Sequence, residues 1–203
     1  MLQIDGLCFR YPQRSLFTHW SARIPSGLTL VRGGDGSGKT TSLRLLAGEL
    51  PADAGQLLLA NITLRDSPDA YRNQVFWVDP RSDAFDRITA AEYFSSLRRL
   101  YPEFNEPLLR ELQDGLSLTP HLDKPMYMLS TGSKRKVWLA AAFAAGAAVT
   151  LIDEPFAALD NASVGFVLAL LEEIAADPDR AWVVAHHETL CAVPLAHIIE
   201  LGD

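Results

Sequence analysis

The chain has 203 residues, 48% of them hydrophobic, and a formal net charge of -7 at pH 7. This length allows one domain with a sizeable core and is too short for two ordinary domains. The acidic balance argues against a nucleic-acid-binding protein, because contacts to a phosphate backbone require a basic face.

The first third of the chain predicts a β-rich layer. Short extended runs at residues 7–11, 28–31 and 56–59 are separated by segments that contain proline and glycine. The run at residues 28–31 is apolar and β-branched, which predicts a buried strand, and residues 41–47 carry the apolar spacing of a helix.

A glycine-rich loop lies between this strand and this helix. Residues 33–40 match the phosphate-binding pattern G-x-x-x-x-G-K-S/T, in which backbone amides and the helix N-terminus hold polyphosphate. Lys39 would reach the terminal phosphates, and Thr40 would offer its hydroxyl to Mg²⁺. Asp35 is an acid where phosphate charge gathers, so we expect its side chain to point away. The predicted nucleotide-binding residues of this segment are Gly33, Gly34, Asp35, Gly36, Ser37, Gly38, Lys39, Thr40 and Thr41.

Residues 89–145, the helical block, predict helices at 90–100, 107–116 and 134–145, separated by prolines. An apolar stretch at residues 137–152 falls short of the roughly 20 residues that span a bilayer. We divide it at Gly146 into the end of a helix and a buried strand at residues 149–152. We therefore expect no membrane-spanning segment.

The last third predicts a strand at 149–152, a helix at 163–176 and a strand at 181–185, the alternation of a parallel sheet with crossover helices. The first strand runs directly into Asp153 and Glu154. Ligands of open α/β sheets bind at this edge, so Asp153 is predicted to hold Mg²⁺ through water and Glu154 to deprotonate the water that attacks a γ-phosphate. The alternative is a pair of solvated acids at a strand end.

Further short motifs follow in a fixed order. Residues 129–136, the signature segment, read Leu-Ser-Thr-Gly-Ser-Lys-Arg-Lys. Ala-Leu-Asp follows at residues 158–160, and Val-Val-Ala-His-His-Glu at residues 183–188. With the phosphate loop and with Tyr11 upstream of it, this order resembles the ATP-binding subunits of ATP-binding-cassette (ABC) transporters over nearly the whole chain.

The resemblance implies an α/β fold of the P-loop NTPase type, with a RecA-like parallel sheet core, an N-terminal antiparallel β layer and an inserted helical subdomain. A single ATP-binding domain would occupy residues 1–203, with the core at about 1–88 and 146–203 and the helical subdomain at about 89–145. The implied reaction is hydrolysis of ATP to ADP and phosphate with Mg²⁺ as cofactor.

The resemblance also assigns roles. Tyr11 would stack on adenine, although an aromatic residue beside a proline often only packs. Ser130 and Gly132, before a helix that begins near Ser133, would bind the γ-phosphate of ATP on a second copy of the chain in a head-to-tail dimer, the alternative being an ordinary serine N-cap.

Two adjacent histidines compete for one role. His187 is assigned as the switch histidine that contacts the γ-phosphate, because Glu188 matches the acid that commonly follows it. Only one of two neighbours along a strand can point into the site, so His186 is the alternative.

The chain departs from the family pattern at two places. A predicted strand at residues 75–78 is followed by Asp79-Pro80-Arg81, where the family has a glutamine that contacts magnesium and couples the site to the membrane subunit. Asp79 offers an alternative metal-directed acceptor, but Pro80 stiffens the loop and argues against coupling by the usual side chain. In the signature segment, Thr131 and Ser133 replace a glycine and a glutamine, which adds a Cβ where phosphate approaches. We expect hydrolysis with slow turnover.

The expected partners are ATP, the membrane permease subunits of a transporter and a second copy of the chain, and no nucleic acid. Cys8 and Cys191 lie far apart without metal-ligand spacing, and no signal peptide is expected. We expect a cytoplasmic protein, peripheral on the inner face of the cell membrane through its partners.

Two alternatives from other classes remain: a non-transport ABC-type ATPase switch bound to soluble partners, and a small-molecule phosphotransferase. The cargo is not assigned. The short length and residues 153–156 resemble the cassette subunit of haem exporters for cytochrome c maturation, residues 130–136 resemble multidrug-type exporters, and export is slightly favoured over import.

Overall fold

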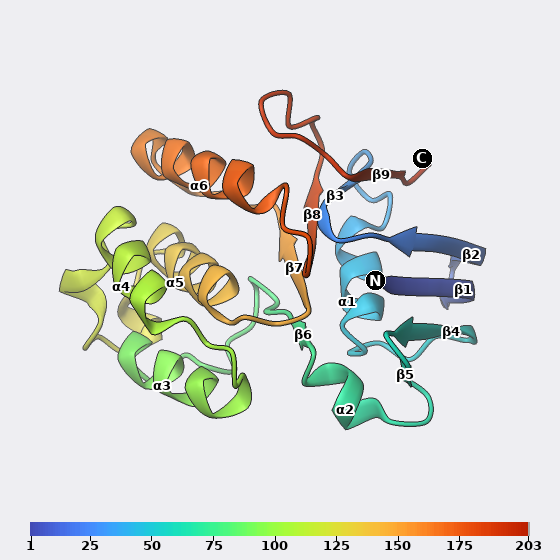
Figure 1. Cartoon of the computed structure of the whole chain (residues 1–203), viewed down its shortest axis with the longest axis horizontal. Helices are drawn as coiled ribbons and strands as arrows, with labels where there is room; N and C mark the ends of the chain where they lie inside the picture. The colour runs from blue at the N-terminus through green and yellow to red at the C-terminus, as the bar shows by residue number, and fades with distance from the viewer. Residues whose placement is uncertain (203) are drawn as a thin grey trace.

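A computed structural model describes residues 1–202 as two sheets and several helices stacked in layers (Figure 1). The antiparallel sheet has the spatial order β2 (Arg14–Ile24), β1 (Leu2–Tyr11), β4 (Ala54–Leu59) and β5 (Ile62–Thr63). The parallel sheet has the order β6 (Val75–Phe76), β7 (Val149–Asp153), β8 (Ala181–His186), β3 (Gly27–Arg32) and β9 (His197–Glu200). The helices are α1 (Lys39–Leu46), α2 (Pro68–Arg72), α3 (Ala90–Leu100), α4 (Glu106–Gly115), α5 (Thr131–Ala144) and α6 (Asn161–Ile174), with 3-10 turns η1 (Thr119–His121) and η2 (Met126–Met128). The predicted α/β class is confirmed.

The parallel sheet is buried on both faces, which is why its strands are continuous apolar runs rather than alternating ones. In β8, Trp182 and Val184 belong to the core that the helices α3 to α6 form on one face. Val183 and Ala185 belong to a second core between the sheet, α1 and the antiparallel strands. Figure 1 shows these layers, with α1 between the two sheets.

Three strands escaped the sequence analysis: β2, β9 and the two-residue β5. The long strand β2 pairs with β1 along most of its length, yet six of its eleven residues are exposed, so it carries no apolar run. The edge strand β9 has one buried residue among four. The predicted strand at residues 75–78 is shorter than expected and ends at Phe76.

Helix ends follow their capping residues. Helix α3 has the predicted bounds, and a reciprocal capping box between Thr89 and Glu92 fixes its start. Helix α6 begins two residues earlier than predicted because Asp160 caps it. The predicted break at Gly146 is confirmed: its φ is +69°, and a Cβ there would collide with the carbonyl oxygen of Glu103. No helix within residues 1–202 is long and apolar enough to span a membrane.

Candidate nucleotide-binding site

The phosphate loop joins β3 to α1 in a conformation that requires its glycines. Gly38, the N-cap of α1, has a φ of 103°, and a Cβ on it would lie 2.8 Å from a methyl carbon of Leu16. A Cβ on Gly33 would lie 2.8 Å from the carbonyl oxygen of Leu201. Helix α1 begins at Lys39, so its unpaired backbone N–H groups open toward the loop.

Lys39 is buried, and its ammonium group lies at the mouth of this loop. Its Nζ donates hydrogen bonds to the carbonyl oxygens of Gly33, at 2.8 Å, and Gly34, at 3.0 Å. It also lies 4.0 Å from Oε1 of Glu154. The positive charge of Lys39 therefore lies between the phosphate loop and the end of β7, where it can attract the terminal phosphates of a nucleotide.

Thr40 and Asp153 form the second pair in the site. The Thr40 hydroxyl donates to Oδ2 of Asp153 at 2.6 Å, across 113 positions of sequence. The other carboxylate oxygen, Oδ1, is buried without a hydrogen-bond partner among the described residues. Burial raises the pKa of Asp153, since its charged form loses solvent there.

These two side chains fit the Mg²⁺ that the sequence predicts. A hydroxyl and a carboxylate are oxygen ligands of the kind that Mg²⁺ prefers, and the unpartnered Oδ1 can accept from a water on the ion. Glu154, His186 and His187 also present ligand atoms within 4.8 Å of one another. Because the Lys39 ammonium lies beside Glu154, we assign the Mg²⁺ site to Thr40 and Asp153.

Glu154 stands at the first position after β7 with a φ of +46°. This left-handed conformation costs a residue other than glycine about 1–3 kcal/mol and is typical of functional sites. Its backbone N–H donates to the carbonyl oxygen of Ala185 at 2.9 Å, which fixes the turn. The carboxylate is thereby directed into the site.

Both histidines approach Glu154, but only His187 lines the cleft. His186 Nδ1 lies 2.7 Å from Oε2 of Glu154, and His187 Nδ1 lies 3.5 Å from the same oxygen. Strand β8 ends at His186, so the alternation of a strand does not apply to His187. His186 is buried, whereas His187 is exposed and lines the cleft.

A cleft of about 760 Å³ brings the predicted residues together. Tyr11, at the end of β1, is 42% exposed, and its hydroxyl lies 3.2 Å from Oγ1 of Thr41. The part of the phosphate loop that lines the cleft includes Asp35. The predicted site residues among its lining are Tyr11, Asp35, Gly36, Gly38, Lys39, Thr40, Thr41, Asp153, Glu154 and His187.

The signature segment is placed differently. Helix α5 begins at Thr131, earlier than predicted, because the Ser130 hydroxyl accepts a hydrogen bond from the backbone N–H of Ser133 at 3.1 Å. Gly132 lies in the first turn, where a Cβ would be 2.5 Å from the carbonyl oxygen of Ala158. Neither Ser130 nor Gly132 lines the cleft of its own chain, although Thr131 does.

Three arginines of the cleft were missed by the sequence analysis. Arg14 donates to the carbonyl oxygen of Gly36 at 3.0 Å, Arg135 lies on α5, and Arg81 follows β6. The basic run at residues 134–136 was the one available signal for Arg135. Asp79, the alternative to the absent glutamine, lies outside the cleft lining, and its Oδ1 accepts a hydrogen bond from the backbone N–H of Arg81 at 2.9 Å.

The family model described as "ABC transporter" matches residues 19–157. The chain belongs to the ABC transporter family. As an ATP-binding subunit of this family, it is 31% identical to the cytochrome c biogenesis ATP-binding export protein CcmA of Pseudomonas putida, covering 92% of this chain and 89% of CcmA. It is also 29% identical to the manganese transport system ATP-binding protein MntB of Listeria monocytogenes, over 92% of this chain and 80% of MntB.

Solved ABC structures share the fold. The ATP-binding subunit of an ABC transporter matches with a TM-score of 0.83 at 22% identity, covering 94% of this chain and 81% of that chain. A dimeric ATP-binding cassette in a post-hydrolysis state, bound to ADP and Pi, matches with a TM-score of 0.75 at 20% identity over 93% and 88%. The P-loop NTPase fold of this ABC subunit is therefore established.

Proposed function

We propose that this ABC subunit hydrolyses MgATP and that ATP-dependent closure of a head-to-tail dimer drives transport through separate membrane subunits. The observation that carries the proposal is the meeting of four side chains in one cleft: Lys39 and Thr40 from the start of α1, and Asp153 and Glu154 from the end of β7. Membership of a family that binds ATP supports the choice of nucleotide.

Binding begins with the phosphate loop. Its backbone N–H groups and the N-terminus of α1 hold the phosphates, and the Lys39 ammonium exchanges the carbonyl oxygens of Gly33 and Gly34 for phosphate oxygens. Tyr11 offers its exposed ring to the adenine. Thr40 and Asp153 hold Mg²⁺, which neutralises charge on the β- and γ-phosphates when it is bound.

Glu154 is the proposed general base. Its carboxylate takes a proton from a water molecule, whose oxygen bonds to the γ-phosphorus while the bond to the β–γ bridging oxygen breaks, giving ADP and phosphate. His186 holds this carboxylate by a 2.7 Å hydrogen bond. The imidazole of His187, on the cleft side, donates a hydrogen bond to the γ-phosphate.

A second copy of the chain supplies the remaining donors. Ser130 and Thr131 are exposed at the N-terminus of α5 and therefore accessible to the nucleotide of a facing copy. Head-to-tail pairing makes two composite sites, so that bound ATP closes the dimer. The dimeric cassette among the structural neighbours supports this arrangement by analogy of fold.

Transport requires membrane subunits, which we propose as partners that hold this subunit at the inner face of the cell membrane. Among similar proteins, one is named for export in cytochrome c biogenesis and another for manganese transport. Proteins with the former name match the chain over nearly its whole length at 30–32% identity. We extend export, rather than import, to this chain.

Phosphate release from purified protein with MgATP tests the hydrolysis. We expect the Glu154→Gln variant to be about 1000-fold slower than wild type, since general bases contribute on the order of 10²–10⁴ in rate. Glu172→Gln, an exposed change on α6, is the matched control and should match wild type. Equal rates for Glu154→Gln and wild type would contradict the assignment.

Purification from membranes tests the partner. Detergent extraction of a tagged chain, expressed with its neighbouring genes, should co-purify a membrane protein. Co-purification of soluble proteins alone would favour the non-transport switch. The purified chain should also release phosphate from MgATP without any added phosphate acceptor. This result would exclude the phosphotransferase alternative.

A further inference from the structure

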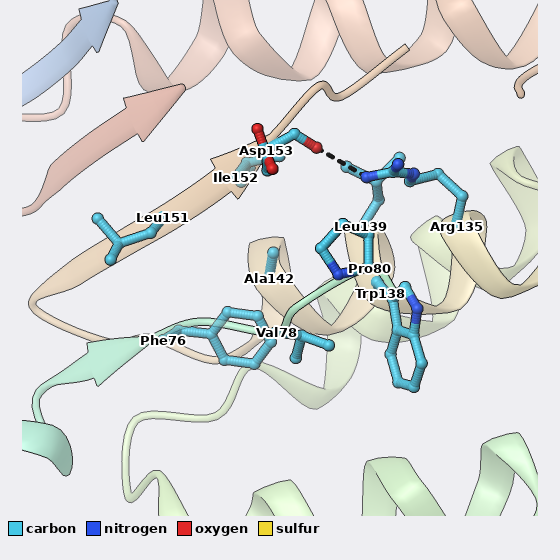
Figure 2. Close-up of a pocket in the computed structure, with 10 residues that line it drawn as sticks. All are labelled: Phe76, Val78, Pro80, Arg135, Trp138, Leu139, Ala142, Leu151, Ile152 and Asp153. Carbon is cyan, nitrogen blue, oxygen red and sulfur yellow. Dashed lines mark hydrogen bonds between the residues drawn. The ribbon is translucent and has the colours of Figure 1, made fainter. Parts of the chain in front are cut away.

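Arg135 joins α5, which carries the signature segment, to β7, the strand that ends at Asp153. Its Nη1 donates a hydrogen bond of 2.7 Å to the backbone carbonyl oxygen of Asp153, the last residue of β7 (Figure 2). This carbonyl belongs to the peptide that connects Asp153 to Glu154. One hydrogen bond thus fixes the distance between α5 and the two acids of the site.

Most of the guanidinium's bonding capacity is unused. An arginine carries five N–H donors in a planar fork, and within residues 1–202 this side chain donates the single hydrogen bond to Asp153. Its side chain lines the cleft together with Lys39, Thr40 and Glu154. Donors without protein acceptors therefore lie at the wall of the nucleotide site.

The charge of Arg135 lies in a partly desolvated position. Burial lowers its pKa, while the charges of Asp153 and Glu154 raise it, and the side chain remains a cation at neutral pH. Arg81 lines the same cleft and adds a second positive charge. Two cations therefore face the acids, and both lie where anionic phosphate would enter.

A small hollow lies beside Arg135. Its volume is about 20 Å³, and its lining includes Arg135 and Trp138 of α5 and Ile152 and Asp153 of β7 (Figure 2). Close-packed cores contain few voids of this kind. The hydrogen bond from Arg135 to Asp153 joins α5 to β7 beside the hollow.

We propose that Arg135 is a positioning residue that detects the γ-phosphate of ATP within its own chain and transmits its presence to α5. With ATP bound, its free N–H groups donate to the γ-phosphate while Nη1 keeps its contact with β7, so that the N-terminus of α5 becomes ordered. ADP lacks this acceptor. The inference rests on the proposed ATPase function and adds a residue that distinguishes ATP from ADP.

The competing role is a brace that holds α5 whatever the nucleotide. The neighbouring lysines provide the comparison, because they also attach α5 to other segments but do not line the nucleotide cleft. The two attachments are Lys134 Nζ to Asp86 Oδ1 at 2.5 Å and Lys136 Nζ to Asp160 Oδ2 at 2.7 Å. A brace would affect both nucleotides equally.

Calorimetry with the non-hydrolysed analogue AMP-PNP and with ADP, both with Mg²⁺, separates the two roles. For Arg135→Met we expect about tenfold weaker AMP-PNP binding, the value of a hydrogen bond to a charged group, and ADP binding within about twofold of wild type. Lys134→Met is the matched control and should keep the wild-type ratio of the two affinities. The wild-type chain and Arg135→Met are then compared in the Ser130→Asp background, which we expect to stay monomeric, so that dimer closure does not protect α5. Hydrogen exchange at residues 131–136 should be slower with AMP-PNP than with ADP when Arg135 is present, and equal in Arg135→Met.

If Arg135→Met loses affinity for AMP-PNP and ADP equally, or for neither, the proposal is overturned and Arg135 is only a structural brace for α5. If Arg135→Met does not fold, Arg135→Lys, which keeps the charge but not the fork, must still lose AMP-PNP affinity selectively. Absence of AMP-PNP binding by wild type would overturn the ATPase proposal together with this one. If wild type binds both nucleotides and Arg135→Met loses affinity for AMP-PNP alone, both the ATPase proposal and the Arg135 proposal are supported.

Discussion

The phosphate loop and the signature segment both carry sequence motifs for phosphate, but they relate to the cleft in different ways. Most of the loop lines the cleft, with Lys39 buried and Thr40 hydrogen-bonded to Asp153. In the signature segment, the Ser130 hydroxyl accepts from the backbone of its own helix and Gly132 lies under Ala158. The first motif meets its partner residues within one chain, whereas the second presents exposed groups, Ser130 and Thr131, to which we give a role only against a facing molecule.

The comparison shows that a motif can carry phosphate-binding residues without forming a binding site within its own chain. A loop whose amides, cation and metal ligand converge can bind its ligand alone. A helix N-terminus whose cap is already satisfied offers only weak donors until another surface approaches it. Variants of the two motifs should therefore fail in different measurements.

The largest effect is expected at the loop. Lys39→Met removes the buried ammonium that replaces carbonyl contacts by phosphate contacts, so MgATP affinity should fall about 100-fold and phosphate release should be lost. Calorimetry checks the affinity. The control is Lys124→Met, an exposed lysine outside the cleft. Near wild-type affinity in Lys39→Met would contradict our account of the loop.

Ser130→Asp sharpens the comparison, because aspartate caps helices as well as serine but repels phosphate. We expect wild-type thermal stability and ATP affinity within about twofold, with phosphate release at least about tenfold slower. Ser130→Ala should lose about 1 kcal/mol of stability through the cap alone. Full activity in Ser130→Asp would reduce Ser130 to an ordinary cap.

The two histidines should differ in how strongly their loss slows hydrolysis. His187→Ala should slow hydrolysis about 100-fold through lost contact with the γ-phosphate. His186→Ala should slow it about tenfold, since Glu154 loses one positioning hydrogen bond. Single-turnover phosphate release measures both. The reverse order would assign the switch role to His186.

The smallest effect concerns stability. Burial raises the pKa of Asp153, so the folded chain holds this proton more tightly than the unfolded chain does. The ionised carboxylate therefore weakens the fold as pH rises above about 4 and continues to do so at pH 7. Without nucleotide, Asp153→Asn should melt a few degrees higher at pH 7, with the gain shrinking toward pH 4, while phosphate release is lost. A lower melting temperature at pH 7 would contradict the buried charge.

The sequence predicted those parts of the site that are encoded by consecutive residues. The phosphate loop and the strand before Asp153 were found because the required residue types are contiguous. The strands β2 and β9 were not, because their exposed side chains leave no apolar pattern. Pairing with neighbours in the sheet, which no local pattern encodes, makes them strands.

Contacts through the backbone also escaped prediction. Arg135 bonds to a carbonyl oxygen 18 positions away, and any residue at position 153 would present the same acceptor. The joint approach of His186 and His187 to Glu154 depends on where β8 ends, which differs by one residue from the predicted strand. Asp79 was offered by analogy as a metal-directed acceptor, but it lies outside the cleft lining and turns one carboxylate oxygen to its own loop.

The central claim is that each chain holds half of a composite ATP site. Light scattering of the Glu154→Gln variant, which we expect to bind ATP but to hydrolyse it about 1000-fold more slowly, tests this most directly. We expect a dimer with saturating MgATP, a monomer with MgADP, and a monomer with either nucleotide once Ser130→Asp is added. A Glu154→Gln chain that stays monomeric with saturating MgATP would contradict the composite site.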